Sequence, residues 1–395
     1  MPKKKKILIF SPPFGGHLYI LKELILKNKS KYNFKLVITG WKNIQPDLGN
    51  LKNLTTILAK SNLKETDPCL WTFKRVYELL DDVLSITKKF EPDLIIYDFF
   101  SIEGYFAGKI LNIPYWSSIP ALIGPSENQK YLKSKLSAKT NQKFIKKIEK
   151  KLNIKIDKNE IEIISDGLHL PGELNLIWSY PNITPNNFRK NRKKAKYIFL
   201  GNPRGENIKP TKIKNKKPTI YFSLGTVVMN NLWNQQKETR KKLTEFISEI
   251  ARLWNNNNFN VVFVSQGKKI LNKYPPNWRV IKKSNQVKEL SKADLFVTHG
   301  GSNSFHEAIL QKVPMIAIPF FGDQPLVAKQ IQKLGIGINL VKDKNIDTKK
   351  NKKFLNKKLA HKLNKTVIEI PNKKYYEKPL LSNTTQIKSL FNKYL

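Results

Sequence analysis

Two polar side chains follow apolar, strand-like runs in the first quarter of the chain. His17 comes after the run Lys5–Ser11, two prolines and a Gly-Gly pair, where a helix is expected to begin. Asp98 ends the apolar run DLIIYD. A histidine can accept a proton near neutral pH, and a neighbouring carboxylate fixes its tautomer and stabilises its charged form. These residues indicate a general-base pair, although a packed His17 and a helix-capping Asp98 explain the pattern about equally well on the residues alone.

A second group of residues suited to chemistry lies near position 300. The strand-like run DLFVT leads into His299, Gly300 and Gly301, and a helix is expected to start at Ser302 or just after it. Glycines let a ligand approach the backbone closely. A helix start offers unpaired N–H groups and the positive end of the helix dipole. The segment therefore predicts a site for a diphosphate.

Further polar residues extend this predicted site. Asn303 and Ser304 add capping and hydrogen-bonding side chains, and Glu307 lies one helical turn beyond Asn303 on the same face. A carboxylate there can accept hydrogen bonds from ribose hydroxyls. Asp323 and Gln324 follow the next strand-like run, so their side chains are expected in the same place, where carboxylate and amide suit sugar hydroxyls.

The elements that position these residues alternate between short apolar strands and helical stretches. This alternation predicts parallel sheets, and hence an α/β fold of two Rossmann-like, doubly wound domains that face a cleft. We expect an N-terminal domain at 1–205, a linker at 206–217, a C-terminal domain at 218–380, and a segment at 381–395 whose helix packs back on the N-terminal domain. The expected strands are 6–11, 35–40, 55–59, 93–100, 112–116 and 174–180 in the first domain, and 219–225, 260–266, 278–283, 294–300 and 314–320 in the second; the expected helices include 71–90, 103–111, a lysine-rich region at 127–160 and 384–394.

Composition limits the class of protein. The chain has 395 residues, of which 40% are hydrophobic, enough for a sizeable core. Its single cysteine, Cys69, allows no intramolecular disulfide. The apolar run after the basic start ends at Pro12, too short for a signal peptide, and no run reaches the ~18 residues of a membrane helix. We expect a soluble, cytoplasmic protein.

The formal net charge of +42 is extreme. Such a charge favours polyanionic partners such as nucleic acid or an anionic membrane surface. However, lysine and asparagine are frequent throughout the chain and arginine is scarce, which is typical of compositional drift in an A/T-rich genome. Since no nucleic-acid-binding motif accompanies the charge, drift is favoured over a specific nucleic-acid function. Peripheral contact with an anionic membrane stays open.

The segment 284–325 resembles the signature region of family 1 UDP-glycosyltransferases. The matching parts are Gln286–Leu290, His299–Glu307, the Lys-Val-Pro at 312–314, and the Asp-Gln pair at 323–324. FSLGT at 222–226 and FVSQG at 263–267 are similar to the first two strands and loops of the family's donor domain. The run DQPLVAKQIQKLGIGINL resembles the bacterial branch that acts on macrolides and carotenoids. The resemblance covers most of residues 218–340.

This resemblance implies a GT-B fold and a role for each matching residue. His17 would be the catalytic base and Asp98 its partner. One departure is Lys283, which stands where many plant members have a tryptophan that stacks on uracil. In the donor site, Thr226, His299, Gly301, Asn303 and Ser304 would hold the diphosphate, Glu307 the ribose, Gln286 and Val287 the base, and Asp323 and Gln324 the transferred sugar.

The resemblance further implies an inverting transfer of a sugar, expected to be of the glucose type, from a UDP-sugar to a hydroxyl of a lipophilic small molecule. The UDP-sugar is a co-substrate, and neither a metal nor a cofactor is expected. Acceptor specificity is assigned to residues 60–75 and 118–180, and aromatic residues after Asp98, among them Phe99 and Phe100, suggest an apolar acceptor pocket. Two alternatives stay open: a membrane-associated N-acetylglucosaminyl transferase acting on a lipid-linked acceptor, and a catalytically inactive protein that binds sugar nucleotides or polyanions.

Overall fold

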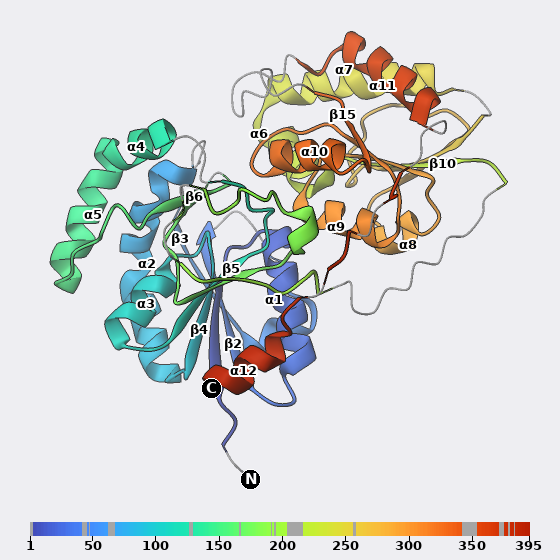
Figure 1. The fold of residues 1–395 in the computed structure, drawn as a ribbon. Coiled ribbons are helices and arrows are strands. Elements are labelled where there is room, and N and C mark those ends of the chain that lie inside the picture. The colour runs from blue at the N-terminus through green and yellow to red at the C-terminus, as the bar shows by residue number, and fades with distance from the viewer. Residues whose placement is uncertain are drawn as a thin grey trace. The chain divides into compact units, whose positions relative to one another are not determined.

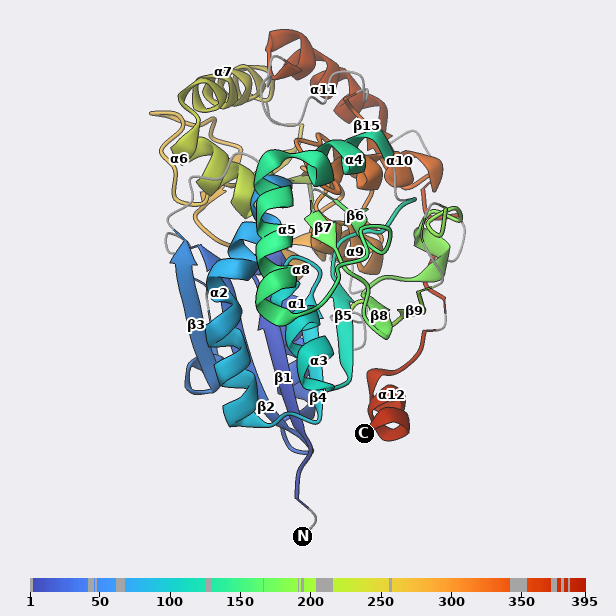
Figure 2. The ribbon, with the colours of Figure 1, turned by 90° about the vertical axis from the view of Figure 1, so that its left-hand side faces the viewer.

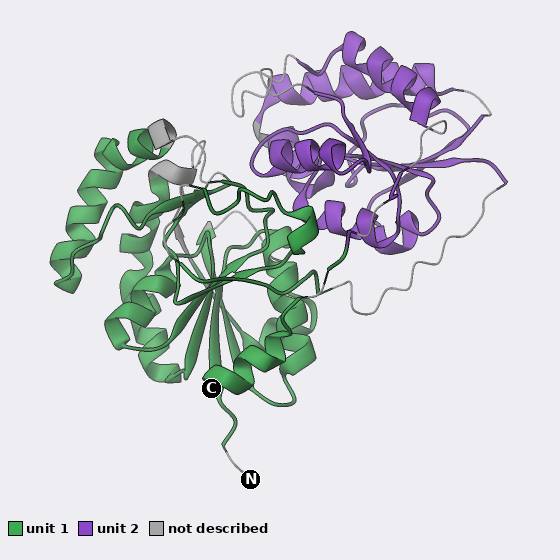
Figure 3. Ribbon diagram, viewed as in Figure 1, with its two compact units in different colours: residues 1–203, 381–395 green, residues 204–380 purple. Residues whose placement is uncertain are grey.

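The structure is a computed structural model, and the chain divides into two compact units (Figure 3). Unit 1 comprises residues 1–203 and 381–395, and unit 2 comprises residues 204–380. Most of the predicted linker 206–217 and part of the segment 60–75 lie outside the described residues. The structure describes residues 3–41, 46, 48–61, 68–125, 129–165, 167–190, 192, 195–203, 216–255, 258–341, 354–370, 375–377, 380–382 and 384–395.

Unit 1 is built on a seven-stranded parallel sheet with the strand order β3-β2-β1-β4-β5-β8-β9. Its central strands are buried on both faces, apart from Lys6 at the start of β1, which is why they read as continuous apolar runs. The strands are β1 (Lys6–Ser11), β2 (Asn33–Trp41), β3 (Thr55–Ser61), β4 (Leu94–Asp98), β5 (Tyr115–Ile119), β8 (Leu174–Ile177) and β9 (Tyr197–Phe199); β6 (Glu162–Ile164) and β7 (Gly167–His169) form a separate antiparallel hairpin.

Helices cover both faces of this sheet (Figures 1 and 2). Helices α1 and α12 lie on one face, where Phe391 stacks on Trp116 with ring centroids 6.0 Å apart. Helices α2, α3 and α5 lie on the other face. The helices are α1 (Gly15–Asn28), α2 (Pro68–Phe90), α3 (Glu103–Leu111), α4 (Gln129–Ser137), α5 (Lys139–Leu152) and α12 (Ile387–Tyr394), with short 3₁₀ turns at Gly49–Leu54 and Pro181–Ile183.

Two expectations for unit 1 need correction. The fifth strand begins at Tyr115 and not at residue 112, because α3 ends with Asn112 in the left-handed conformation (φ 51°) and Pro114 follows. The region 127–160 is not helical throughout. Its second helix ends at Leu152, where Asn153 again adopts a left-handed conformation (φ 52°). Such residues end helices because the backbone can no longer continue the right-handed hydrogen-bond pattern.

Unit 2 contains a six-stranded parallel sheet with the order β12-β11-β10-β13-β14-β15. The last strand, β15, was not expected from the sequence. The strands are β10 (Thr219–Ser223), β11 (Asn260–Val264), β12 (Trp278–Ile281), β13 (Leu295–Thr298), β14 (Met315–Ala317) and β15 (Gly337–Asn339); the helices are α6 (Trp233–Gln235), α7 (Lys237–Leu253), α8 (Gln286–Leu290), α9 (Ser302–Leu310), α10 (Gln324–Lys333) and α11 (Lys357–Glu369), with a π-helical segment at Val227–Leu232.

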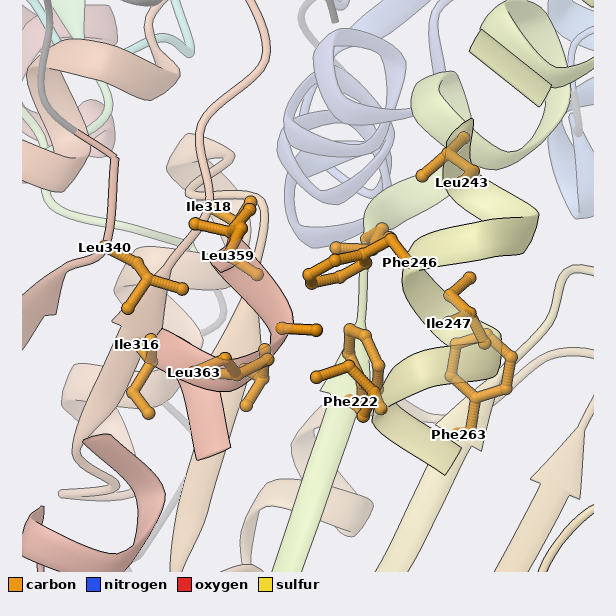
Figure 4. Packing of buried hydrophobic residues seen from close by; sticks show 14 of the residues in the cluster. Phe222, Leu243, Phe246, Ile247, Phe263, Ile316, Ile318, Leu340, Leu359 and Leu363 are labelled. Atoms are coloured by element: carbon orange, nitrogen blue, oxygen red, sulfur yellow. The ribbon is translucent and has the colours of Figure 1, made fainter. Parts of the chain in front are cut away.

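The core of unit 2 lies between one face of its sheet and the helices α7 and α11 (Figure 4). Phe246 of α7 lies beside Phe222 of β10, and Leu359 and Leu363 of α11 close the same cluster. All four side chains are nearly or wholly buried. Two parallel α/β units therefore confirm the predicted fold class. Among the described residues, no helix is long and apolar enough to cross a membrane.

Candidate active site

His17 and Asp98 meet at the carboxyl edge of the sheet of unit 1. Strands β1 and β4 are hydrogen-bonded neighbours with Phe10 paired to Tyr97, so the residues that follow them emerge side by side. The His17 Nδ1 lies 2.9 and 3.0 Å from the two carboxylate oxygens of Asp98. The Asp98 carboxylate is fully buried, whereas 19% of the His17 side chain is exposed.

This geometry sets what the histidine can do. With Nδ1–H donated to the carboxylate, the lone pair of Nε2 points away from Asp98. No described residue forms a hydrogen bond with Nε2. Asp98 is itself held by the backbone N–H of Phe100, which donates to Oδ1 at 2.9 Å. The pair therefore has the arrangement of an oriented general base.

An aromatic wall surrounds the His17 ring. The ring centroids of Phe14, Phe99 and Phe100 lie 5.9, 5.3 and 5.2 Å from that of His17. Phe99 and Phe100 also pack on one another at 4.6 Å. Phe99 is fully buried, whereas Phe14 and Phe100 are partly exposed beside the His17 ring.

Two features behind this wall were not anticipated from the sequence. Arg75 of α2 donates from Nε to Glu103 Oε1 at 2.7 Å and also donates to the carbonyl oxygen of Phe100. Both charged side chains are buried. Gly167 of the β6–β7 hairpin packs so closely that an added Cβ would lie 2.9 Å from the Phe100 ring. Arg75 and Glu103 are 28 positions apart in the sequence. No helix or strand period connects residues at that separation, so the sequence did not indicate the ion pair.

In unit 2, the His299 ring is packed between two glycines that follow neighbouring strands. An added Cβ at Gly225, after β10, would lie 2.4 Å from the ring, and one at Gly301, after β13, would lie 2.5 Å from Nε2. Gly225 and Gly300 have positive φ angles of 76° and 79°, which favour glycine. Glycine at positions 225 and 301 leaves room for the imidazole beside the start of α9.

The electrostatics of this site suit an anion. Burial lowers the pKa of His299 to about 4, so the ring is neutral near pH 7. Its Nδ1 has no hydrogen-bond partner among the described residues. Helix α9 begins directly after Gly301, and its first N–H groups lie at the same place. A neutral donor and a helix N-terminus can together bind phosphate oxygens.

The predicted base and ribose residues form one hydrogen-bonded chain. The Gln286 amide nitrogen donates to Ser304 Oγ at 2.9 Å and to Glu307 Oε2 at 2.6 Å. Its Oε1 lies 3.5 Å from the hydroxyl of Tyr221, which also lies 2.7 Å from Ser284 Oγ. Tyr221 and Ser284 were not predicted from the sequence as members of this chain of hydrogen bonds. Tyr221 is almost fully buried on β10, where its alternation with Phe222 is indistinguishable from ordinary core packing.

The remaining predicted donor residues are distributed over the same edge of the unit 2 sheet. Gln324 is buried, and its Oε1 accepts hydrogen bonds from the backbone N–H groups of Phe320 and Phe321 at 2.8 and 3.2 Å. This carbonyl therefore holds the loop after β14, and only the amide nitrogen is left for a sugar. Asp323 immediately precedes α10, and Thr226 is exposed after β10. Asn303 lies in the first turn of α9, and Val287 lies half-buried on α8.

Lys283, at the position of the family's stacking tryptophan, is exposed and lines an open groove of about 720 Å³. Tyr221 and Ser284 lie on the same groove, which runs beside α8. As for metals, no cluster of three or more histidine, cysteine or acidic side chains that could hold an ion occurs in the described part of the chain.

Two parallel α/β units, one with an oriented histidine and the other with a glycine-lined helix start, have the architecture of the GT-B fold. The model of the family described as UDP-glucoronosyl and UDP-glucosyl transferase matches residues 209–368. The resemblance inferred from the motifs is thereby confirmed, and the chain is an enzyme of the UDP-glycosyltransferase class.

Comparisons with individual proteins lead to the same class. The chain is 27% identical over 301 residues to the NDP-glycosyltransferase YjiC of Bacillus subtilis, which covers 74% of this chain and 71% of the relative. A stretch of 50 residues, 12% of this chain and 10% of the relative, is 56% identical to human UDP-glucuronosyltransferase 3A2. The solved structure of the glycotransferase of kitacinnamycin has a TM-score of 0.70 at 18% identity, covering 94% of this chain and 92% of that one. The calicheamicin glycosyltransferase CalG4 gives 0.65 at 17% identity, covering 93% and 94%.

Proposed function

We propose that the protein transfers a hexosyl group, with inversion and without a metal ion, from a UDP-sugar to a hydroxyl of a lipophilic small molecule. The observation that carries this proposal is the His17–Asp98 pair, with Nε2 open and Nδ1 held by a buried carboxylate. The solved structures with a similar fold include the glycotransferase of kitacinnamycin and the calicheamicin glycosyltransferase CalG4, which is consistent with a small-molecule acceptor.

The proposed reaction is a single displacement. His17 Nε2 takes the proton of the acceptor hydroxyl while that oxygen forms a bond to the anomeric carbon. The bond between this carbon and the phosphate oxygen breaks, and UDP leaves with the electron pair. Asp98 stabilises the imidazolium that results. Attack opposite to the leaving group inverts the anomeric configuration.

The donor roles are assigned on the same basis. The first N–H groups of α9 and the neutral His299 would stabilise the charge that develops on the diphosphate, which makes a metal ion unnecessary. Glu307 would accept hydrogen bonds from the ribose, with Gln286 holding its carboxylate in place. Asp323 and the amide nitrogen of Gln324 would contact the sugar.

The test is a panel of UDP-glucose, UDP-N-acetylglucosamine and TDP-glucose against macrolide, polyphenol and sterol-type alcohols and one lipid-linked sugar, in buffer containing EDTA. We expect a glycoside of a lipophilic alcohol from UDP-glucose, with the opposite anomeric configuration by NMR. Failure to transfer or hydrolyse any donor contradicts the proposal, and a requirement for Mn²⁺ contradicts its metal-independent form. A product formed only from UDP-N-acetylglucosamine and a lipid-linked acceptor would select the alternative transferase.

A further inference from the structure

Helices α4 and α5 of unit 1 concentrate the positive charge of the chain. Together their sequences contain nine lysines, one glutamate and no arginine, a net charge of +8. By comparison, α2 is 23 residues long and has four cations against three carboxylates. Helix α7, with 17 residues, has five cations against three. The lysines that looked evenly spread in the sequence are therefore not evenly distributed among the helices.

On α5 these lysines share one face. Ile145 and Ile148 are buried in the core cluster that contains the side chains of α2. Successive residues of a helix are separated by about 100°, so Lys143, Lys146 and Lys150 lie on the side opposite to these isoleucines. Seven lysines of the two helices are exposed: Lys133, Lys139, Lys143, Lys146, Lys147, Lys150 and Lys151.

The charge on this face is largely uncompensated. Among the described residues, Lys151 alone of the seven pairs with a carboxylate, at 2.6 Å from Asp81. The helix's own acid, Glu149, instead accepts a hydrogen bond from the backbone N–H of Ile156. Lys147 lies over the rings of Tyr77 and Phe144, at 5.2 and 5.5 Å, so cations cover the aromatic groups at the edge of the face.

We propose that the exposed lysines of α4 and α5 form a docking surface for an anionic phospholipid membrane. Lysine is a compact point charge that interacts with phospholipid headgroups without a fixed geometry. A nucleic-acid surface would instead favour arginine forks and exposed aromatic rings for base stacking. Helices α4 and α5 contain no arginine, and among the described residues the rings of Tyr77 and Phe144 are covered by Lys147. The proposal is independent of the acceptor and would hold if another acceptor class proved correct.

Helix α4 places one end of the docking surface near the carboxyl edge of the unit 1 sheet. Figure 2 shows α4 at the end of unit 1 toward which the strands point, and His17 follows β1 at this carboxyl edge. Lys133 of α4 therefore lies at the carboxyl-edge end of the docking surface, whereas the six exposed lysines of α5 lie on a helix that packs against α2.

The experiment is flotation of the full-length protein with vesicles of phosphatidylcholine and phosphatidylglycerol, and with phosphatidylcholine alone. We expect the protein to float with the anionic vesicles at physiological salt and to be released at high salt, because exposed charges are screened. The triple variant Lys143→Gln, Lys146→Gln, Lys150→Gln should lower the partition coefficient by roughly 100-fold, since each lysine near an anionic surface contributes about fivefold.

The matched control removes the same charge elsewhere. The variant Lys241→Gln, Lys357→Gln, Lys358→Gln changes exposed residues of α7 and α11 and should keep the partition coefficient within about threefold of the parent. Equal losses in both variants, no difference between neutral and anionic vesicles, or tighter binding of a single-stranded oligonucleotide to the same lysines would each overturn the proposal. Turnover of a water-soluble acceptor, measured in parallel, tests the proposed reaction separately and should be unchanged in both variants.

Discussion

The candidate sites of the two units are built in different ways. In unit 1, the proposed chemistry depends on two side chains, His17 and Asp98, which are held to each other at 2.9 Å. In unit 2, the site depends on backbone: two glycines make room for a neutral His299, and the helix start supplies N–H groups. A site built from one oriented side chain should fail when that side chain is removed. A site built from many backbone contacts should fail when the backbone is displaced.

The largest effect is expected at the base. His17→Ala should lower kcat by roughly 10²- to 10⁴-fold, the usual contribution of a general base. The dissociation constant of UDP should stay within about twofold, since unit 2 is unchanged. Steady-state kinetics and calorimetry of UDP binding measure the two quantities. Normal turnover of this variant would show that His17 is not the base.

Replacing the glycine at the start of a helix should weaken UDP binding in unit 2, at Gly301, and leave it unchanged in unit 1, at Gly15. Gly301→Ala should weaken UDP binding by roughly 10- to 100-fold, because its Cβ would displace the His299 ring and with it one or two hydrogen bonds to the diphosphate. Gly15, at the start of α1, has no atom within 4 Å of an added Cβ. Gly15→Ala is therefore the control and should bind UDP like the parent. Equal UDP affinity in the two variants would contradict a backbone-built donor site.

Acid should destabilise unit 2 through its buried histidines. Burial lowers the pKa of His306 to about 4 in the folded protein, whereas the unfolded value is near 6.5. The unfolded state therefore binds the extra proton first, and stability is full above pH 6.5 and is lost as the pH falls toward 4. We expect a loss of about 2 kcal/mol at pH 5 from this residue, or roughly 30-fold in the unfolding equilibrium.

Denaturant unfolding at pH 7 and pH 5, followed by hydrogen exchange in each unit, measures this loss. His306→Gln keeps a hydrogen-bonding side chain near the Ser302 carbonyl, which now lies 2.7 Å from Nδ1, and should reduce the pH dependence. The same pH dependence in the variant would exclude His306 as its source.

The smallest effect should come from a pair of buried tyrosines, one in each unit. Tyr221→Phe removes the hydroxyl beside Gln286 Oε1 and should raise the KM for the UDP-sugar by about 3- to 10-fold, with kcat nearly unchanged. The control is Tyr97→Phe, which removes a hydrogen bond of 2.6 Å to the Leu170 carbonyl in unit 1. It should lower stability and leave the KM for the donor as it is. If the KM for the donor rises in both variants, the effect of Tyr221→Phe comes from a general loss of stability and not from the hydroxyl beside Gln286.

The sequence by itself determined the two parallel sheets and the order of the polar residues at their edges. The buried strands read as continuous apolar runs because both faces are covered, and parallel strands end at one edge, so His17 could be placed near Asp98 and His299 near Glu307. Gly300 and Gly301 were informative because they mark the turn between a strand and a helix, where Gly300 has a positive φ of 79°.

Only the tertiary structure decided how the side chains divide their hydrogen bonds. Gln286 donates to Glu307, the Gln324 carbonyl holds its own loop, and Arg75 supports Phe100 from α2. The antiparallel hairpin β6–β7 and the edge strand β15 were also not predicted from the sequence. Each has only three residues per strand, too few to show a period, and their positions are set by packing against residues distant in the chain.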